Sequence, residues 1–416
     1  MTESKLPIGA SIENVKTRIG VAKLTRLAFE GGDLGALWND LLESTYDQPA
    51  DTGVIMDLSV LAQILGDPQS GARLQDGALQ VDRLYRMPPE SGTPRLRLLA
   101  LAGATDIGGN IPIGFLIGNS DVDLLTLYVV PGEPLPDPLP EHDVALVVLG
   151  NSDAMMATLD ALKDITPRWP RAILNQPDRV LQLERDRFCA LMQGAAHIEL
   201  PKTARLSREV VRQIGHGDCQ LSSVLSDGEF PLIIRPVNSH AGRGLTRLDD
   251  AAAVDHYLAE QPEAEFFISR FVDYSSPDGL YRKYRIVFID GRPFACHMAI
   301  ADDWKVWYLN ANMDQDAGKR DEEGRFMETF DDGFATRHAD AFDELTSRVG
   351  LDYFGIDCAE TKDGRLLVFE AETALIVHDM DPPDVYPYKV GAMKKLFSAF
   401  VDMLYRRAEA GRVEAA

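Results

Sequence analysis

Hydrophobic residues in the first quarter of the chain recur with the spacing of amphipathic helices. The segment "IENVKTRIGVAKLTRLAFEGG" ends in two glycines, and four of its apolar residues fall near one stripe: Val15, Ile19, Leu24 and Leu27. A stripe with a period near 3.6 residues, stopped by glycine, is typical of a helix with one buried face. We therefore expect residues 1–95 to form a mostly helical region that ends in a linker, "MPPESGTP".

From Leu96 onward the pattern changes to short, continuous apolar runs. Three of them read "LRLLALAG", "LLTLYVV" and "DVALVVLG", and a helical pattern, "SDAMMATLDALKDI", follows the third. Continuous runs of this kind are typical of strands buried on both faces, and their alternation with helices predicts a parallel sheet. We expect residues 96–175 to form a small parallel α/β domain, whose glycine-rich loop "ATDIGGN" could approach a ligand.

Beyond residue 176 the apolar runs are separated by hairpin signals. "RIVFIDGRPFACHMAI" and "GIDCAETKDGRLLVFEAE" each hold Asp-Gly between two apolar runs, which is a strong signal for a two-residue turn. The last helix is amphipathic, with apolar residues at i, i+3, i+4, i+7 and i+8: Met393, Leu396, Phe397, Phe400 and Val401. The whole pattern predicts the α/β and α+β fold class, with hairpins in residues 176–410.

The second hairpin places three carboxylates on one face of a sheet. If Asp363 and Gly364 form a two-residue turn, Asp357 lies opposite Glu370, and Glu372 shares their face. Like charges directly opposite one another destabilise a sheet. A divalent cation such as Mg²⁺ or Mn²⁺ would neutralise them, so we expect a metal site at these carboxylates; the alternative is a solvated acidic face.

A cation and a flexible loop follow the strand "PLII". Arg235 stands at the end of this strand, and the loop after it supplies small or permissive residues: Asn238, Ser239, Gly242 and Gly244. Successive N–H groups in such a loop can form an anion-binding nest, and arginine adds a permanently charged fork. We expect the loop to contact phosphate, although no Gly-Lys-Ser/Thr motif follows and a plain hairpin turn is the alternative.

Composition narrows the classes of partner. Asp and Glu outnumber Lys and Arg by 65 to 42, and the formal net charge of −23 argues against nucleic acid or an anionic membrane as a partner. No apolar run approaches the roughly 20 residues that span a bilayer, and the start lacks a signal-peptide pattern. The four cysteines show no zinc spacing, so we expect free thiols in a cytoplasmic protein.

The order of these features resembles the ATP-grasp superfamily over roughly residues 170–405. The matching segments are the Asp-Arg pair at 186–187, "PLIIRPVNSHAGRG", "FFISRFVDY", the strand around Arg285, and the "GID" and "FEAE" strands of the last hairpin. The resemblance is to the carboxylate–amine ligase type, such as the ribosomal protein S6 modification enzyme and glutathione-synthetase-like ligases. It implies an ATP-grasp fold of two lobes with the nucleotide between them, in residues 176–410, preceded by the α/β domain.

The resemblance also implies roles for individual residues. Those implied to bind ATP are Arg187, Arg235, Asn238, Ser239, Gly242, Gly244, Phe271 and Val272; Arg285 is implied to be catalytic, and Asp357, Glu370 and Glu372 to hold Mg²⁺ or Mn²⁺. The chain departs from the family pattern at four positions, three of them among these residues. Arginine replaces lysine at 187 and 235, Lys283 replaces an aspartate, and Glu372 replaces an asparagine.

These expectations combine into a ligase that uses ATP to join a carboxylate to an amine or a thiol through an acyl phosphate. Its partners would be ATP and a small substrate or peptide, and the chain could form a homodimer. Two alternatives stay open: a non-catalytic nucleotide-binding or scaffold protein of the same fold, and a small-molecule kinase. The identity of the acid and of the amine is not encoded in any motif of the sequence.

Overall fold

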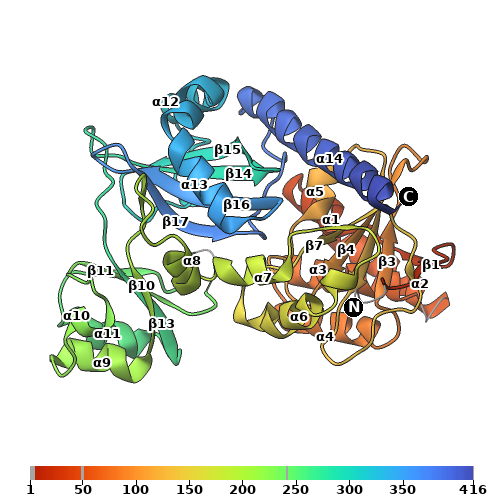
Figure 1. Cartoon of the computed structure of the whole chain (residues 1–416), viewed down its shortest axis with the longest axis horizontal. Helices are drawn as coiled ribbons and strands as arrows, with labels where there is room; N and C mark the ends of the chain where they lie inside the picture. Colours follow the sequence, from red (N-terminus) through yellow and green to blue (C-terminus); the bar gives the residue numbers. More distant parts are fainter. Residues whose placement is uncertain (1–4, 48–50, 240–241, 416) are drawn as a thin grey trace.

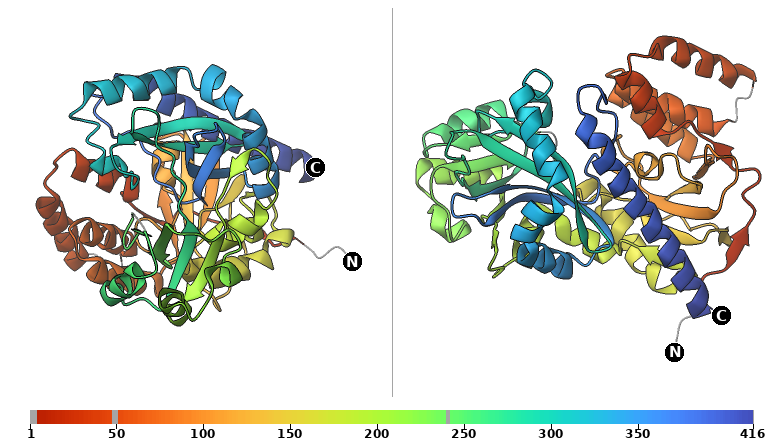
Figure 2. Two further views of the ribbon diagram at one scale, coloured as in Figure 1. Left: turned by 90° about the vertical axis from the view of Figure 1, so that its left-hand side faces the viewer. Right: turned by 90° about the horizontal axis from the view of Figure 1, so that it is seen from above.

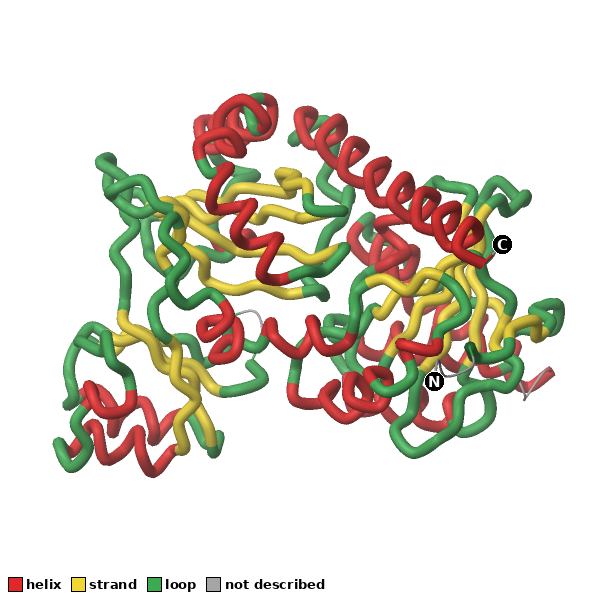
Figure 3. The backbone as a smooth tube through the Cα atoms, in the orientation of Figure 1, coloured by secondary structure: helices red, strands yellow, loops and turns green. Residues whose placement is uncertain are grey.

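The computed structural model describes residues 5–47, 51–239 and 242–415 of the chain. Helices and strands are both abundant (Figure 3), and the strands form parallel as well as antiparallel sheets. The expected α/β and α+β fold class is therefore confirmed. Within these ranges, no helix is both long and apolar enough to cross a membrane.

The N-terminal region is mainly helical, but the predicted stripe is helical only from Val21 onward, so Val15 and Ile19 precede the helix. Among its described residues the helices are α1 (Val21–Phe29), α2 (Leu34–Asp47), α3 (Thr52–Ile64) and α4 (Pro68–Leu79). Helix α3 begins where the Asp51 side chain accepts hydrogen bonds from the N–H groups of Gly53 and Val54, and α4 begins at a similar Asp67 cap. Both caps follow from the preference of aspartate for helix starts.

A six-stranded sheet forms the centre of the first half of the chain. Its order is β2-β3-β5-β4-β7-β8, and all neighbours are parallel except β3 and β5. The strands are β2 (Lys16–Thr17), β3 (Leu84–Met87), β4 (Leu96–Ala102), β5 (Val122–Tyr128), β7 (Val144–Val147) and β8 (Ala172–Leu174). Strands β2 and β3 come from the segment expected to be helical, because runs of two and four residues carry too few apolar residues to show a period.

Smaller elements complete this half. Strands β1 (Ile8–Ala10) and β6 (Leu139–Pro140) form a separate parallel pair. The helices are α5 (Ile113–Ile117), α6 (Asp153–Lys163), α7 (Pro177–Val180) and α8 (Arg185–Leu191), with single 3₁₀ turns at Thr166–Arg168 and Leu181–Leu183.

The second half contains two mainly antiparallel sheets. The four-stranded sheet has the order β10-β13-β11-β12 and forms the lobe at the lower left of Figure 1. Its elements are β10 (Thr203–Ser207), α9 (Arg208–His216), α10 (Leu221–Val224), β11 (Leu232–Pro236), β12 (Thr246–Leu248), α11 (Ala253–Glu260) and β13 (Glu265–Arg270). Apolar residues of α9 and α11 pack on one face of this sheet as a separate small core.

The five-stranded sheet has the order β15-β14-β16-β17-β9. Its strands are β9 (Ile198–Glu199), β14 (Tyr281–Ile289), β15 (Arg292–Ala301), β16 (Tyr353–Glu360) and β17 (Leu366–Glu372). The helical elements around it are a 3₁₀ turn (Tyr308–Asn310), α12 (Ala317–Glu328), a π-helical turn (Asp331–Ala335), α13 (Ala339–Val349) and α14 (Pro387–Ala415).

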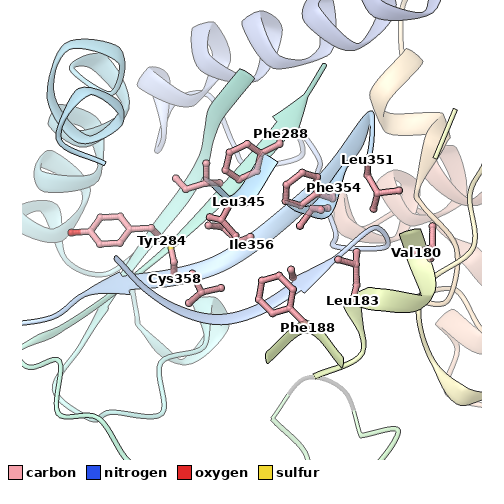
Figure 4. Close-up of a cluster of buried hydrophobic side chains, with 14 of the residues drawn as sticks. Val180, Leu183, Phe188, Tyr284, Phe288, Leu345, Leu351, Phe354, Ile356 and Cys358 are labelled. Carbon is pink, nitrogen blue, oxygen red and sulfur yellow. The ribbon is translucent and has the colours of Figure 1, made fainter. Parts of the chain in front are cut away.

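Aromatic residues fill the core on one face of the five-stranded sheet (Figure 4). Phe288 and Phe354 stack with ring centroids 4.7 Å apart, and Leu345 of α13 belongs to the same cluster. Leu183 and Phe188, from the segment around the start of α8, join this cluster. Side chains alternate along a strand, so neighbouring residues such as Arg285 and Asp357 point to the other face of the sheet.

The hairpin that carries the three carboxylates has a longer turn than expected. The N–H of Thr361 donates to the carbonyl of Arg365 at 3.0 Å, so three residues form the turn, and Gly364 adopts a φ of 83°. This turn shifts the pairing by one residue. A bulge next to Asp357 shifts it back, so Asp357 lies opposite Glu370 as predicted.

Candidate functional site

Four strand ends meet around a cavity of about 230 Å³. Two belong to the parallel sheet, where loop residues from 105–109 and 150–152 follow β4 and β7. The other two are the end of β11, at Arg235, and the end of β17, at Glu372. The cavity thus lies at the carboxyl ends of strands, where α/β folds bind ligands, and the glycine-rich loop after β4 lines it.

A row of charged side chains crosses the five-stranded sheet towards this cavity. Arg285 on β14 pairs with Asp357 on β16, which in turn pairs with Glu370 on β17. Residues directly opposite on neighbouring strands share a face, as do residues two positions apart. Lys283 and Glu372 therefore lie on the same face as the other three.

Asp357 is buried, with 1% of its side chain exposed, and two cations balance its charge. Arg285 donates to its two oxygens at 2.8 and 3.0 Å, and the Nζ of Lys283 lies 2.7 Å from one of them. Burial alone would raise the pKa of Asp357, but Arg285 and Lys283 lower it below the ordinary value. Arg285 also donates to the carbonyl of Ile376 at 2.9 Å, so its guanidinium is held at both ends.

Glu370 and Glu372 face two further arginines. Arg185, the first residue of α8, forms an ion pair with Glu370 and lies 4.0 Å from Glu372; a nitrogen of Arg235 lies 3.8 Å from Glu370. Burial opposes the charge of Glu370, but Arg185 lowers its pKa. Burial and the neighbouring Glu370 raise the pKa of Glu372 to about 7. Burial and the nearby Arg185 lower the pKa of Arg235 to about 10.

Basic side chains compensate the repulsion that the sequence predicts between the three carboxylates. Four cations, Arg185, Arg235, Lys283 and Arg285, face the three carboxylates, so the side chains themselves supply the neutralising charge. Within the described ranges, no group of three or more His, Cys, Asp and Glu side chains is arranged to hold a metal ion. The carboxylate oxygens have the chemistry that Mg²⁺ prefers, but a metal would have to displace these cations. Metal binding by these carboxylates stays a prediction, and no step below depends on it.

The loop after β11 is held close to Arg235. The Nε of Arg235 donates to the Oγ of Ser239 at 3.2 Å, and its guanidinium also donates to the carbonyl of Ser239. Asn238, Gly242 and Gly244 have φ values of 60°, 71° and 67°. Two glycines in the left-handed region explain why this loop needs residues without a side chain.

This loop is also tied to the parallel domain. The side chain of Asn238 accepts from the N–H of Asp153 at 3.2 Å and donates to the Asp153 carboxylate at 3.3 Å. Arg205 on β10 donates to both oxygens of Asp153, at 3.0 and 2.6 Å, and these bonds lower the pKa of Asp153. Asp153, at the start of α6, thus joins the loop and the four-stranded sheet to the parallel domain.

Not every residue that the sequence predicted lies at the cavity. Arg235, Asn238, Ser239, Glu370 and Glu372 line it, while Asp357 and Arg285 lie further along the charged row. Gly242 and Gly244 continue the loop but do not line the cavity.

Three predicted nucleotide-binding residues lie elsewhere. Arg187 donates to the carbonyl of Leu181 at 3.3 Å and contacts the sulfur of Met156. Phe271 lies under the guanidinium of Arg247, and Val272 packs against the main core. None of the three lines the cavity. Their roles in ATP binding stay predictions.

Sequence reasoning missed Arg185 and Asp153. Arg185 lies two positions before Arg187, on the opposite side of the first helical turn, and only the register of α8 shows which arginine faces the carboxylates. The sequence Arg-Asp-Arg at 185–187 contains two arginines, and both could have been named as candidates for the site. Asp153 follows the third apolar run of the parallel domain, and its link to Asn238 joins residues 85 positions apart.

Comparisons with known proteins give structural but not sequence matches. No family model and no curated protein sequence matches the chain. Among solved structures, an ATP-grasp RimK domain protein from Sphaerobacter thermophilus has a TM-score of 0.44 and 13% identity, covering 74% of this chain and 99% of that chain. The D-alanine–D-alanine ligase from Coxiella burnetii has a TM-score of 0.47 and 10% identity, covering 77% and 97%. The D-alanine–D-alanine ligase from Bacillus anthracis complexed with ATP has a TM-score of 0.43 and 14% identity, covering 77% and 99%. These solved structures are ATP-grasp ligases, the family that the sequence resembles.

Proposed function

We propose that the protein is an ATP-dependent ligase that joins a carboxylate to an amine or a thiol through an acyl phosphate. One observation supports this most directly: Arg185 and Arg235 lie beside the glycine-rich loops at the 230 Å³ cavity, and the charged row leads away from it. A surplus of buried cations beside permissive loops suits a polyphosphate. The described residues of the loop after β11, Asn238, Ser239, Gly242 and Gly244, would lie near the phosphates.

The proposed reaction has two steps. An oxygen of the substrate carboxylate attacks the γ-phosphorus of ATP, the bond to the β-phosphate oxygen breaks, and ADP leaves. The amine nitrogen or thiol sulfur then attacks the acyl carbon, inorganic phosphate leaves, and the nucleophile loses a proton. Positioning and charge neutralisation carry most of such phosphoryl transfer, so no nucleophilic side chain is required.

In the proposed reaction, Arg285 would stabilise negative charge. It holds Asp357 with two hydrogen bonds, and its guanidinium is anchored by the carbonyl of Ile376. When a substrate carboxylate enters the row, Arg285 would stabilise the negative charge that develops on the acyl phosphate. Lys283 would keep Asp357 neutralised during that exchange.

Trapping with hydroxylamine tests the reaction without knowledge of the amine. Hydroxylamine attacks an acyl phosphate at carbon and gives a hydroxamate, which ferric ion detects by colour. The protein is incubated with ATP, Mg²⁺, hydroxylamine and a panel of small carboxylic acids and peptides, and ADP is measured in parallel. Hydroxamate and ADP in equal amounts, dependent on one acid, support the proposal.

Variants and the alternative outcomes complete the experiment. Arg235→Leu should abolish hydroxamate formation, while Arg212→Leu, an exposed arginine paired with Glu209 on α9, should leave it intact. A phosphorylated product that hydroxylamine does not cleave would identify a small-molecule kinase instead. ATP binding with no ADP release across the panel would identify a nucleotide-binding or scaffold protein.

A further inference from the structure

A second cavity, of about 110 Å³, lies in the parallel domain behind the glycine-rich loop. It is bordered by the N-terminal helices α1, α3 and α4, by strands β3, β5 and β4, and by residues of the 105–114 segment. Thr105 and Asp106 line both this cavity and the 230 Å³ cavity. One loop therefore forms part of the wall of each.

Small side chains on the sheet create the space. Ala100 and Ala102 on β4 and Thr126 on β5 face the cavity, at positions where neighbouring residues of the same face are larger. On the opposite side, Gly20 and Ala22 begin α1. Small-molecule sites are concave and mostly apolar, so a hollow lined by small residues from several elements indicates room for a ligand.

Two glutamines at the cavity are bonded to the 105–107 segment of the loop. Gln63 accepts from the N–H of Ile107 at 3.0 Å, and Gln75 donates to the carbonyl of Thr105 at 3.1 Å. These two glutamines hold the loop against the N-terminal helices. Any molecule that changes the spacing between those helices and the sheet therefore acts on the loop directly.

The two arginines at the cavity are each paired with a buried aspartate. Arg18 donates to the hydroxyl of Tyr128 at 3.0 Å and lies 3.5 Å from Asp57. Arg86 pairs in register with Leu125, so its side chain lies on the opposite face of the sheet, where it donates to Asp123 at 2.8 Å. Their charges are balanced, so they offer no net attraction to an anion. The remaining walls are mainly apolar, with several aliphatic side chains: Val21, Val60, Ile107, Ile111, Ile113, Leu124 and Val148.

We propose that this cavity binds a small neutral molecule with a branched aliphatic body, and that the bound molecule alters nucleotide affinity through the shared loop. An apolar cavity of roughly 150 Å³ takes benzene, so 110 Å³ suits a body of about five heavy atoms. A neutral polar group on the ligand can meet Arg18 and Tyr128. The binding does not depend on the ligase reaction, so each can fail without the other.

The test uses isovaleramide as the probe. The full-length protein is titrated with isovaleramide, with isovalerate of the same shape but negative charge, and with acetamide, which lacks the aliphatic body. Binding is followed by thermal unfolding and by calorimetry. The variant Ala102→Leu fills the cavity from β4, Ala100→Val is a smaller filling in case the first does not fold, and Ala172→Val on β8 is the control outside the cavity.

We expect isovaleramide to raise the unfolding temperature of the wild type and of Ala172→Val. In a folded filling variant its affinity should fall by about tenfold or more, because the added carbons occupy its place. Acetamide should not bind, and isovalerate should bind more weakly than the amide. Equal binding by wild type and filling variants, tighter binding of isovalerate, or no binding at millimolar isovaleramide would overturn the assignment of this site.

A second measurement tests the coupling. The affinity for ATP is determined with and without saturating isovaleramide, and coupling between two sites is reciprocal, so the probe affinity must change by the same factor when ATP is present. We expect a change of at least about threefold in wild type and none in Ala102→Leu. An ATP affinity that isovaleramide leaves unchanged, while it still binds the cavity, would refute the coupling.

Discussion

The charged row makes Arg185, rather than Arg187, the arginine of α8 on which the site depends. Arg185 is the cation paired with Glu370 and close to Glu372, whereas Arg187 contacts a backbone carbonyl and a methionine sulfur. The two arginines lie in the same helix and differ by two positions, so each is the matched control of the other. We predict that Arg185→Leu abolishes nucleotide binding and destabilises the protein, and that Arg187→Leu does neither.

The expected magnitude follows from the burial of the pair. Removing one partner of a buried ion pair costs about 3–5 kcal/mol, because the other charge is left without compensation. The side chains of Arg185 and Glu370 are 18% and 19% exposed, so we take the lower end, about 3 kcal/mol. For a cooperative unit of 150–250 residues this corresponds to a fall in the unfolding temperature of roughly 6 °C or more.

Thermal unfolding and binding of a fluorescent ATP analogue measure the two effects. Arg185→Leu should unfold well below the wild type and lose detectable binding, while Arg187→Leu should stay within about 1 kcal/mol of wild type. The double variant Arg185→Leu/Glu370→Leu removes both charges and should recover part of the lost stability. Equal effects of the two single variants, or a larger effect at Arg187, would refute the assignment of the charged row.

Three other measurements follow from the same geometry. Asp153→Ala removes the hydrogen bonds to Asn238 and should weaken ATP binding about fivefold to tenfold. Asp160→Ala, at an exposed position on the same helix, should not weaken it. Equal ATP dissociation constants for Asp153→Ala and wild type would contradict the anchoring role of Asp153. Burial opposes ionisation of Glu360, but hydrogen bonds from His338 and Arg337 lower its pKa from 4.5 to about 2, which corresponds to about 3 kcal/mol. That stability is complete above pH 4.5 and is lost towards pH 2. Glu360→Gln should therefore be less stable than wild type at pH 7, by an amount that shrinks between pH 4.5 and 2 in paired unfolding curves. Because side-chain cations already balance the three carboxylates, Mg²⁺ without nucleotide should raise the unfolding temperature by less than about 1 °C, and a larger rise would show metal binding by the free protein.

Most of the secondary structure could be predicted because the spacing of apolar residues along the chain reflects which side chains are buried. The apolar runs of β4, β5 and β7 are buried on both faces, and the stripe of α14 packs on the sheet below it. The short strands β2 and β3 were not predicted, since two to four residues do not establish a period. The boundaries of the three predicted domains stay a prediction.

The part of the candidate site that lies within one hairpin could be predicted from strand pairing. The contacts between segments far apart in the sequence could not. The pairing of Asp357 with Glu370 follows from one hairpin, although a three-residue turn and a bulge replace the expected two-residue turn. Arg285 was named only from the family resemblance. No local rule brings Arg185 to Glu370, 185 positions away, or Asp153 to Asn238.

The contacts of helix α14 limit how the chain can be divided into fragments. It starts beside α12 and β15, runs over the outside of the molecule and ends on β7 and β8, so it contacts both halves (Figure 2). Its residues Phe400 and Leu404 share a core with Leu98 and Val144 of the parallel sheet and with Val287 of β14. A fragment cut near residue 176 would expose this shared core on both pieces. The two halves therefore cannot be exchanged between relatives as independent modules: a chimera would need to keep each parallel domain together with its own C-terminal helix.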